Sequence, residues 1–314
     1  MKPIKEKKTQ RALKEQRTAY LLLIPAFLGL SLITYLPLLA VFVIGFTNLK
    51  IGHFVPGSSI GPLEFVGFAN FVDIFTNPSI DFLNSIKVTV NYSLLAVFMS
   101  IIYSFLIAML LNRKVPARGF FRAVFYIPYI LPATSVIITW NFLLRRDGGI
   151  VNHILASLGL SRSYFLSSAD TVIPTLAMIA VWTCGNLIVI FLAGLQNVPR
   201  VYSEAADIDG AGWWHKFWKI TIPFMSPIIF YNLLMSLVIN IQIVVPALAV
   251  TSGGPGKSTV FMTYLMYTTA FRSSDFGKAG AIAFVFFIVA AILAAILFIT
   301  SKSWIFLEEG DDKG

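Results

Sequence analysis

Cysteine and charged side chains are both scarce in this chain of 314 residues. Cys184 is the only cysteine, so no disulfide can form within the chain, and no metal-ligand companions accompany it. We therefore expect no metal site. Charged residues make up 12% of the chain and hydrophobic residues 57%. Soluble domains carry about twice that charged fraction, so this composition excludes a soluble globular domain and indicates that most of the chain lies in lipid.

Acidic residues are absent from the long apolar runs, which are long enough to cross a membrane as helices. The runs predict an all-α integral membrane protein with six transmembrane helices. The expected spans are 20–46, 86–111, 123–144, 171–195, 223–250 and 276–300. Kinks or short breaks are expected at the prolines within them, Pro25, Pro37, Pro128, Pro132 and Pro246. The lack of a carboxylate within the spans argues against a carrier driven by protons or sodium ions.

Lysine and arginine are unequally distributed between the two sides that six spans define. Sixteen of the 24 fall in the two terminal tails and the loops 112–122 and 196–222, and eight fall on the other side, in its loops or at the ends of the spans that adjoin them. Because cytoplasmic segments carry the excess of Lys and Arg, both termini are predicted to be cytoplasmic. The same rule accounts for the net charge of +9, so no nucleic-acid partner is expected.

The predicted organisation is a basic cytoplasmic tail (1–18), a single transmembrane domain (19–304) and a second cytoplasmic tail (305–314). The loop 197–223 lies inside this domain, on its cytoplasmic side.

The first half of this loop predicts a short helix with a close-packing face. Asn197 is expected to cap a helix whose early position is Pro199, where a missing N–H costs nothing. Glu204 lies about a turn and a half into that helix, and Ala205 and Ala206 are small enough for a partner to approach closely. Gly210 and Gly212 are expected to end the helix.

The second half of the loop predicts an amphipathic helix on the membrane surface. Its aromatic side chains suit the headgroup level and its lysines suit the phosphates. These residues are Trp213, Trp214, Phe217 and Trp218, with Lys216 and Lys219. Pro223 is expected to open the next span.

The order of residues in this loop resembles the EAA loop of ABC-importer permease subunits. It reads Glu-Ala-Ala, three residues, Gly, nine residues, then Ile-x-Ile-Pro. The resemblance implies that the loop seats in a separate ATP-hydrolysing subunit, so this chain itself is expected not to be an enzyme and to hold no catalytic residue. The implied coupling residues are Glu204, Ala205, Ala206, Asp207, Gly210 and Pro223.

The segments 240–255 and 276–281 are similar to the carbohydrate-uptake branch of these permeases, the maltose-type first permease subunit and its relatives. The resemblance implies the six-helix, MetI-like core of type I importers. It also implies a heterodimer with a second permease subunit, two ATPase subunits that bind ATP and Mg, and an extracytoplasmic solute-binding protein. The implied location is the cytoplasmic membrane of a prokaryote.

Amide side chains within the spans are candidate sugar ligands, because sugars are bound by amides together with aromatic faces. Asn232, Ser236 and Asn240 form one helical stripe, and Gln242 lies off it. The resemblance implies that Asn240 and Gln242 bind substrate, because they fall where the family's sugar contacts lie in the fifth span. It implies the same for Trp182 and Asn186 in the comparable part of the fourth span, and Tyr92 and Trp140 are further aromatic candidates. For any single Asn, hydrogen bonding between helices is an equally good interpretation.

Three alternatives remain open at this stage. A permease for glycerol-3-phosphate would look much alike, although it would favour a basic cavity and no Lys or Arg lies deep in a span. An ion-coupled carrier or a non-transporting scaffold would leave the EAA loop unexplained.

The run 253–259 ends like a P-loop, but Thr251 stands where a phosphate cradle needs Gly, so no nucleotide is expected on this chain.

Overall fold

The computed structural model describes residues 10–57, 60–113 and 116–306, with helices as its regular elements and only isolated bridges between extended residues in those ranges. Its helices are α1 (Gln10–Leu30), α2 (Leu36–Ile44), α3 (Ala69–Thr76), α4 (Phe82–Asn112), α5 (Arg118–Ile130), α6 (Ala133–Leu143), α7 (Ile150–Ser157), α8 (Ala169–Trp182), α9 (Gly185–Asn197), α10 (Arg200–Ile208), α11 (Trp213–Lys216), α12 (Ile222–Ile241), α13 (Met262–Tyr267) and α14 (Phe276–Ser301).

Four stretches of helix in the described ranges are long and apolar enough to cross a membrane, and the number rises to six if each of two bent pairs is one span. The four are Glu15–Ile44, Phe82–Asn112, Trp213–Ile241 and Phe276–Ser301. The bent pairs are α5 with α6, which meet at 100°, and α8 with α9, which meet at 51°. The expected span 123–144 is therefore broken at Leu131–Pro132, because Pro132 disfavours helical backbone at the residue before it.

The fifth expected span differs from the structure at both ends. Helix begins at Trp213 and continues through Pro223 to Ile241, so Pro223 does not open it. A π-helical segment, Phe217–Thr221, lies just before this proline, where the regular hydrogen bond of the missing N–H is lost. After Ile241 the helix ends, and a second π-helical segment follows at Ala247–Thr251.

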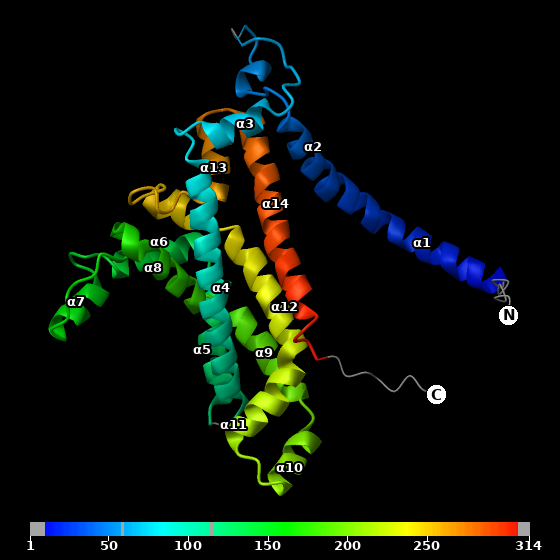
Figure 1. The fold of residues 1–314 in the computed structure, drawn as a ribbon, viewed down its shortest axis with the longest axis vertical. Coiled ribbons are helices and arrows are strands. Elements are labelled where there is room, and N and C mark those ends of the chain that lie inside the picture. Colours follow the sequence, from blue (N-terminus) through cyan, green and yellow to red (C-terminus); the bar gives the residue numbers. More distant parts are fainter. Residues whose placement is uncertain (1–9, 58–59, 114–115, 307–314) are drawn as a thin grey trace.

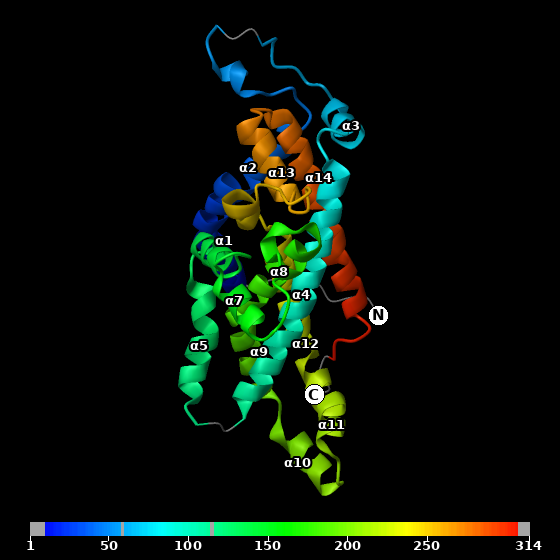
Figure 2. The ribbon, with the colours of Figure 1, turned by 90° about the vertical axis from the view of Figure 1, so that its left-hand side faces the viewer.

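Helix α4 is the central element of the bundle and packs against α8, α9 and α12 (Figures 1 and 2). Its buried face carries small hydroxyl side chains, which let neighbouring backbones approach closely. These residues are Ser85, Thr89, Ser93, Ser100 and Ser104. Several hydroxyls donate to the carbonyl one turn earlier, as Ser93 does to Thr89 at 2.7 Å, so they are satisfied without a partner on another helix.

Helices α1 and α2 leave the bundle and project to one side (Figure 1). No residue in the most apolar window of this stretch is buried within the chain. The contact that holds it lies at its far end, where α2 crosses α14. A Cβ on Gly280 would lie 2.7 Å from the backbone nitrogen of Gly45, so only glycine permits this crossing.

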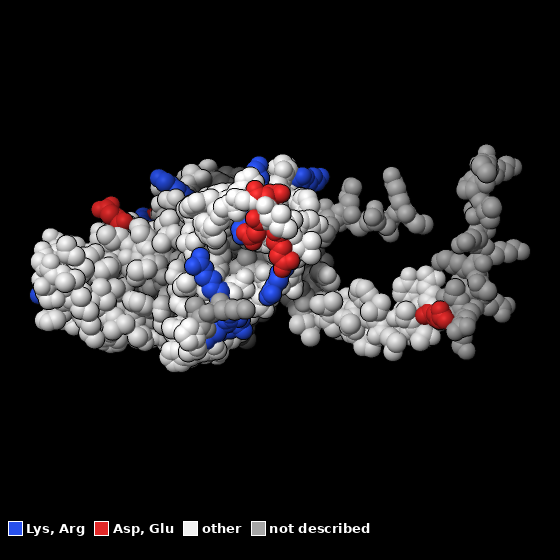
Figure 3. Space-filling model, turned by 90° about the horizontal axis from the view of Figure 1, so that it is seen from below, with Lys and Arg blue, Asp and Glu red and all other residues white. Residues whose placement is uncertain are grey.

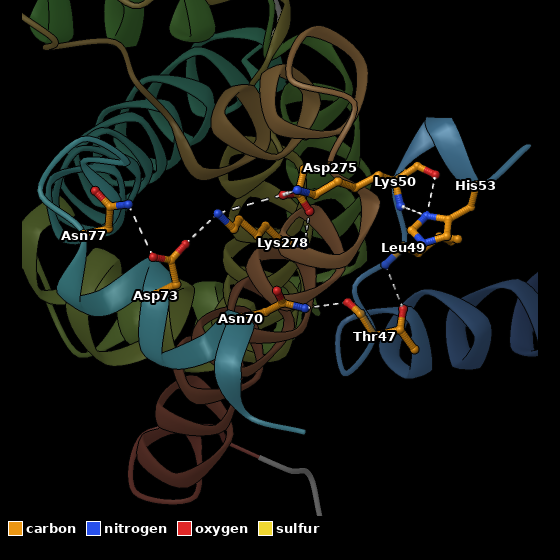
Figure 4. A network of polar contacts seen from close by, with 9 residues as sticks. All are labelled: Thr47, Leu49, Lys50, His53, Asn70, Asp73, Asn77, Asp275 and Lys278. Atoms are coloured by element: carbon orange, nitrogen blue, oxygen red, sulfur yellow. Dashed lines mark hydrogen bonds and ion pairs between the residues drawn. The ribbon is translucent and has the colours of Figure 1, made fainter. Parts of the chain in front are cut away.

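A polar network fixes the loop that joins α2 to α4 onto the start of α14 (Figure 4). Asn70 of α3 donates to the carbonyl of Thr47 at 2.7 Å. Lys278 pairs with Asp73 at 2.7 Å, and the buried Asp275 caps α14 by accepting the Lys278 N–H at 3.0 Å. Hydrogen bonding from Lys278, followed by Asn77, lowers the pKa of Asp73 despite its partial desolvation. The end of the molecule opposite α10 is therefore tied together by charge as well as packing.

Candidate functional site

A cavity of about 320 Å³ lies in the bundle where three helical stretches break. Its wall includes the bend between α5 and α6, the bend between α8 and α9, and the chain that follows α12. Broken helices leave backbone polar groups without their usual partners, which is why irregular backbone at membrane depth is tolerated around a cavity. The breaks therefore give the cavity polar groups that continuous helices would lack.

Every side chain with hydrogen-bonding capacity on the cavity wall is uncharged. These residues are Tyr92, Ser100, Tyr129, Thr183, Cys184, Asn186, Ser236, Asn240 and Gln242. The remainder of the wall is aliphatic or proline. Such a lining can offer hydroxyl and amide hydrogen bonds and two aromatic rings, but no ion pair.

Three of the four expected substrate residues line this cavity together, namely Asn186, Asn240 and Gln242. They differ in how far their amides are already used. The Asn240 amide donates to the carbonyl of Ser236 at 2.8 Å, and its oxygen accepts from Tyr92 at 3.3 Å. Gln242 donates to the carbonyl of Val238 at 2.9 Å. The half-buried Asn186 makes no side-chain hydrogen bond within the described ranges, so its whole amide is available.

Trp182, the fourth expected residue, does not line the cavity. It packs edge-to-face on Trp140, with ring centroids 5.5 Å apart. The aromatic rings that do line the cavity belong to Tyr92 and Tyr129. The sequence offered a signal for Tyr129, because it stands between the two prolines that bracket the α5–α6 bend, Pro128 and Pro132.

A second candidate site is the surface of α10, at the end of the molecule that Figure 3 views from below. The helix begins at Arg200 after Pro199, and Asn197 is the last residue of α9, so the expectation that Asn197 caps α10 is wrong. At the other end Gly210 takes φ +74°, as a helix-ending glycine should. Gly212 instead has φ −68° and precedes α11 as its N-cap.

The exposed face of α10 is apolar at its centre. Val201, Ala205 and Ile208 follow the i, i+4, i+7 spacing of one helical face, and Ile208 is 88% exposed. Glu204 is exposed beside this stripe and forms no ion pair with any described residue. Val201 and Ile208 were not among the expected coupling residues, and their helical spacing in the sequence is the signal that places them on one face with Ala205.

Two of the remaining expected coupling residues, Ala206 and Asp207, make contacts that hold the end of α10, and Tyr202 adds a contact with α12. Ala206 is half-buried, and its carbonyl accepts from Ala211 at 2.8 Å across the turn at Gly210. Asp207 pairs with Lys216 of α11 at 2.6 Å. The ring of Tyr202 packs at a tilt against the ring of Phe224 of α12, with centroids 4.9 Å apart. The orientation of α10 is therefore linked to the helix that ends at the cavity.

The sequence of residues 100–305 matches the family described as binding-protein-dependent transport system inner membrane component. A sn-glycerol-3-phosphate transport system permease protein, UgpA of Agrobacterium fabrum, is 31% identical over 75% of this chain and 80% of its own. The multiple sugar-binding transport system permease protein MsmF of Streptococcus mutans is 30% identical over 77% of this chain and 82% of its own.

The fold also resembles a solved permease structure. A chain of a bacterial alginate ABC transporter, in complex with a periplasmic protein bound to an alginate pentasaccharide, superposes with a TM-score of 0.77. That match covers 94% of this chain and 98% of the other at 20% identity. The likeness shows a shared fold of ABC importer permeases.

Proposed function

Because this chain belongs to the family of binding-protein-dependent transport system inner membrane components, we propose that it is the membrane-spanning subunit of an ATP-driven sugar importer. The observation that carries this proposal is the uncharged, amide-lined cavity at three helix breaks, with α10 linked through α12 to the same region. In this proposal the chain forms part of the translocation path and hydrolyses no ATP.

The chemistry of the cavity supports a neutral polar substrate. Sugar hydroxyls both donate and accept hydrogen bonds, which suits the amides of Asn186, Asn240 and Gln242. The rings of Tyr92 and Tyr129 offer apolar faces for the C–H side of a sugar. The volume of about 320 Å³ is near the lower end of ligand pockets, so it suits one end of an oligosaccharide. Glycerol-3-phosphate is the alternative substrate, but its phosphate would find no cationic partner on this wall.

The surface of α10 is proposed to dock into an ATPase subunit. Val201 and Ile208 would be buried on docking, and Glu204 would meet a cation or a backbone donor of the partner. When ATP closes a pair of ATPase subunits, α10 would transmit the movement to α12 through Tyr202 and Phe224. The cavity would then alternate between inward- and outward-facing states, as alternating access requires.

Two further protein partners are proposed, one in the membrane and one outside it. A second permease subunit in a heterodimer is proposed to complete the translocation path, and the exposed α1–α2 stretch offers it a large apolar surface. An extracytoplasmic solute-binding protein would deliver sugar at the end opposite α10. The proposed location is the cytoplasmic membrane of a prokaryote, with both termini in the cytoplasm, lipid around the spans and no nucleic-acid partner.

Uptake by the complete complex in proteoliposomes tests this function. The chain is co-purified with a second permease and an ATPase from neighbouring genes, and ATP is enclosed on the α10 side. Accumulation of a labelled oligosaccharide that needs ATP and the solute-binding protein is the expected result. Uptake of glycerol-3-phosphate alone would select the alternative substrate. Uptake that needs no ATP and is abolished by an ionophore would instead indicate an ion-coupled carrier.

A further inference from the structure

A basic cavity of about 720 Å³ lies near α10, apart from the uncharged cavity described above. It is enclosed by the end of α4, the start of α5, the end of α9, and α10 with α11 and the π-helical segment after it. Five cationic side chains line it, and none of its lining residues is acidic. The five are Arg113, Arg118, Arg122, Arg200 and Lys216.

Four of these five cations are uncompensated. Lys216 pairs with Asp207 at 2.6 Å, whereas none of the arginines pairs with a carboxylate in the described part of the chain. The Nε of Arg122 is out of contact with solvent and has no hydrogen-bond partner there. The guanidinium groups on the wall have no carboxylate to pair with, so an oxyanion in the cavity would compensate their charge through the N–H groups that face it.

The position of the cavity along α4 indicates the source of that oxyanion. Helix α4 has 31 residues, about 46 Å of helix, which matches the full thickness of a bilayer with its headgroups. Its last residue, Asn112, lines the cavity, so a bilayer matched to the length of α4 would bring the lipid phosphates to the level of the arginines. Trp213, which also lines it, is of the type enriched at this interface.

The surface next to the cavity suits acyl chains. Phe121 and Val124 of α5 are exposed one to two turns beyond Arg118, toward the middle of the membrane. A lipid with its phosphate among the arginines could lay its chains along these side chains. Figure 2 shows α4 and α5 running to this end of the molecule as two separate arms. Several α5 side chains are exposed, Phe121 and Val124 among them.

We propose that this cavity binds the phosphate headgroup of an anionic phospholipid, which bridges Arg118 and Arg122 of α5 to Arg200 of α10. Bound there, the lipid links the start of α5, whose other end bends at the uncharged cavity, to α10. This inference goes beyond the proposed transport function, because the binding of lipid to the chain does not depend on what is transported.

Native mass spectrometry of the full chain, released from bilayers of phosphatidylglycerol mixed with phosphatidylcholine, tests the proposal. The variant replaces Arg118, Arg122 and Arg200 with Gln. The matched control replaces three arginines of the segment between α6 and α8, Arg145, Arg146 and Arg162, with Gln. Each arginine near an anionic lipid is worth about 1 kcal/mol, which is about a fivefold change in lipid affinity. The amount of retained phosphatidylglycerol should therefore fall by more than tenfold in the triple variant and stay unchanged in the control.

Four outcomes would overturn the proposal. The variant could keep its preference for phosphatidylglycerol, or the control could lose as much, either of which would show that the cavity is not the site. Millimolar inorganic phosphate could displace the lipid, which would identify a site for free phosphate. Lipid could bind only after Glu308, Glu309, Asp311 and Asp312 are changed to amides, which would make the acidic C-terminal segment the occupant. Unchanged melting of every variant in pure phosphatidylcholine serves as the check on folding.

Discussion

The hydroxyl of Tyr92 donates to Oδ1 of Asn240 at 3.3 Å and thereby joins α4 to α12 at the edge of the uncharged cavity. The Asn240 amide nitrogen is used as well, by the carbonyl of Ser236 at 2.8 Å. Both side chains are buried. Asn240 is therefore a link between and within helices in this conformation, in addition to being part of the cavity wall.

A double-mutant cycle on this pair should reveal the link. Asn240→Ala is expected to destabilise the chain by about 1–3 kcal/mol, because it leaves the buried Tyr92 hydroxyl without an acceptor. In a Tyr92→Phe background the same substitution should cost less, since there is no hydroxyl to strand. Thermal melting of the four proteins in detergent measures the difference. Equal costs in both backgrounds would show that the hydrogen bond contributes nothing.

Asn186 should report substrate binding more cleanly than Asn240. Its amide has no partner among the described residues, so Asn186→Ala removes a possible sugar contact without breaking an internal hydrogen bond. Losing one neutral hydrogen bond costs about 0.5–1.5 kcal/mol, so the Km for sugar should rise roughly 2- to 12-fold with the melting temperature unchanged. Uptake assays at varied sugar concentration check this. An unaltered Km would exclude Asn186 from the substrate site.

The apolar stripe on α10 should decide whether the ATPase binds. Ile208→Asp places a charge at the centre of the exposed face and is expected to abolish co-purification of the ATPase subunit, with loss of uptake. Leu158→Asp changes another exposed apolar side chain, 69% exposed and just beyond α7, and is the matched control that should leave both intact. Retention of the ATPase by Ile208→Asp would refute docking through this face.

Backbone geometry at Gly210 gives a graded test of the same helix. Gly210→Ala keeps the turn but forces a side chain into positive φ, at a cost of about 1–2 kcal/mol, so uptake should fall in part. Gly210→Pro cannot adopt that φ and also removes the N–H that donates to Asp207 at 3.1 Å. Uptake should therefore be lost in this variant, with the chain still in the membrane by fractionation. Full uptake in both variants would contradict the coupling role of this turn.

The ion pair between Asp73 and Lys278 should make the free energy of unfolding fall slightly at acid pH. The pKa of Asp73 is lowered in the folded chain, so its contribution is present above the ordinary carboxyl range and is lost as pH falls through the lowered value. Because the pair is partly exposed, the loss should be below about 1 kcal/mol. In Asp73→Asn, the melting temperature should fall less steeply as pH is lowered through this range. A profile between pH 5 and 2 that is identical in both proteins would contradict it.

The sequence predicted the helical class and the approximate location of the apolar stretches, because lipid imposes both length and composition on a span. It could not predict the geometry of the breaks. Pro132 marks a boundary in the sequence, yet nothing local specifies a bend of 100° between α5 and α6, which depends on packing against α9. The expectation that Pro223 begins a span was wrong for a related reason. The π-helical segment before this proline lets the helix continue through it.

The candidate cavity was predictable only in part. Amides in apolar runs are conspicuous, and three of the four selected residues do meet at the cavity. Trp182 was selected for its aromatic ring, but its direction is set by Trp140, a contact that sequence spacing does not reveal. Which amides are free and which are already bonded depends on neighbours far apart in the chain, as Tyr92 and Asn240 are.

The uncharged wall of the central cavity has an electrical consequence. A membrane potential acts on a transport step only in proportion to the charge that moves, at about 2.3 kcal/mol per elementary charge for each 100 mV. With no ionisable Asp, Glu, Lys, Arg or His on the wall, neither a neutral sugar nor the wall around it carries charge through the bilayer. This wall therefore adds no voltage dependence to the movement of a neutral sugar, and any such dependence would have to come from the part of the path that the second permease is proposed to line.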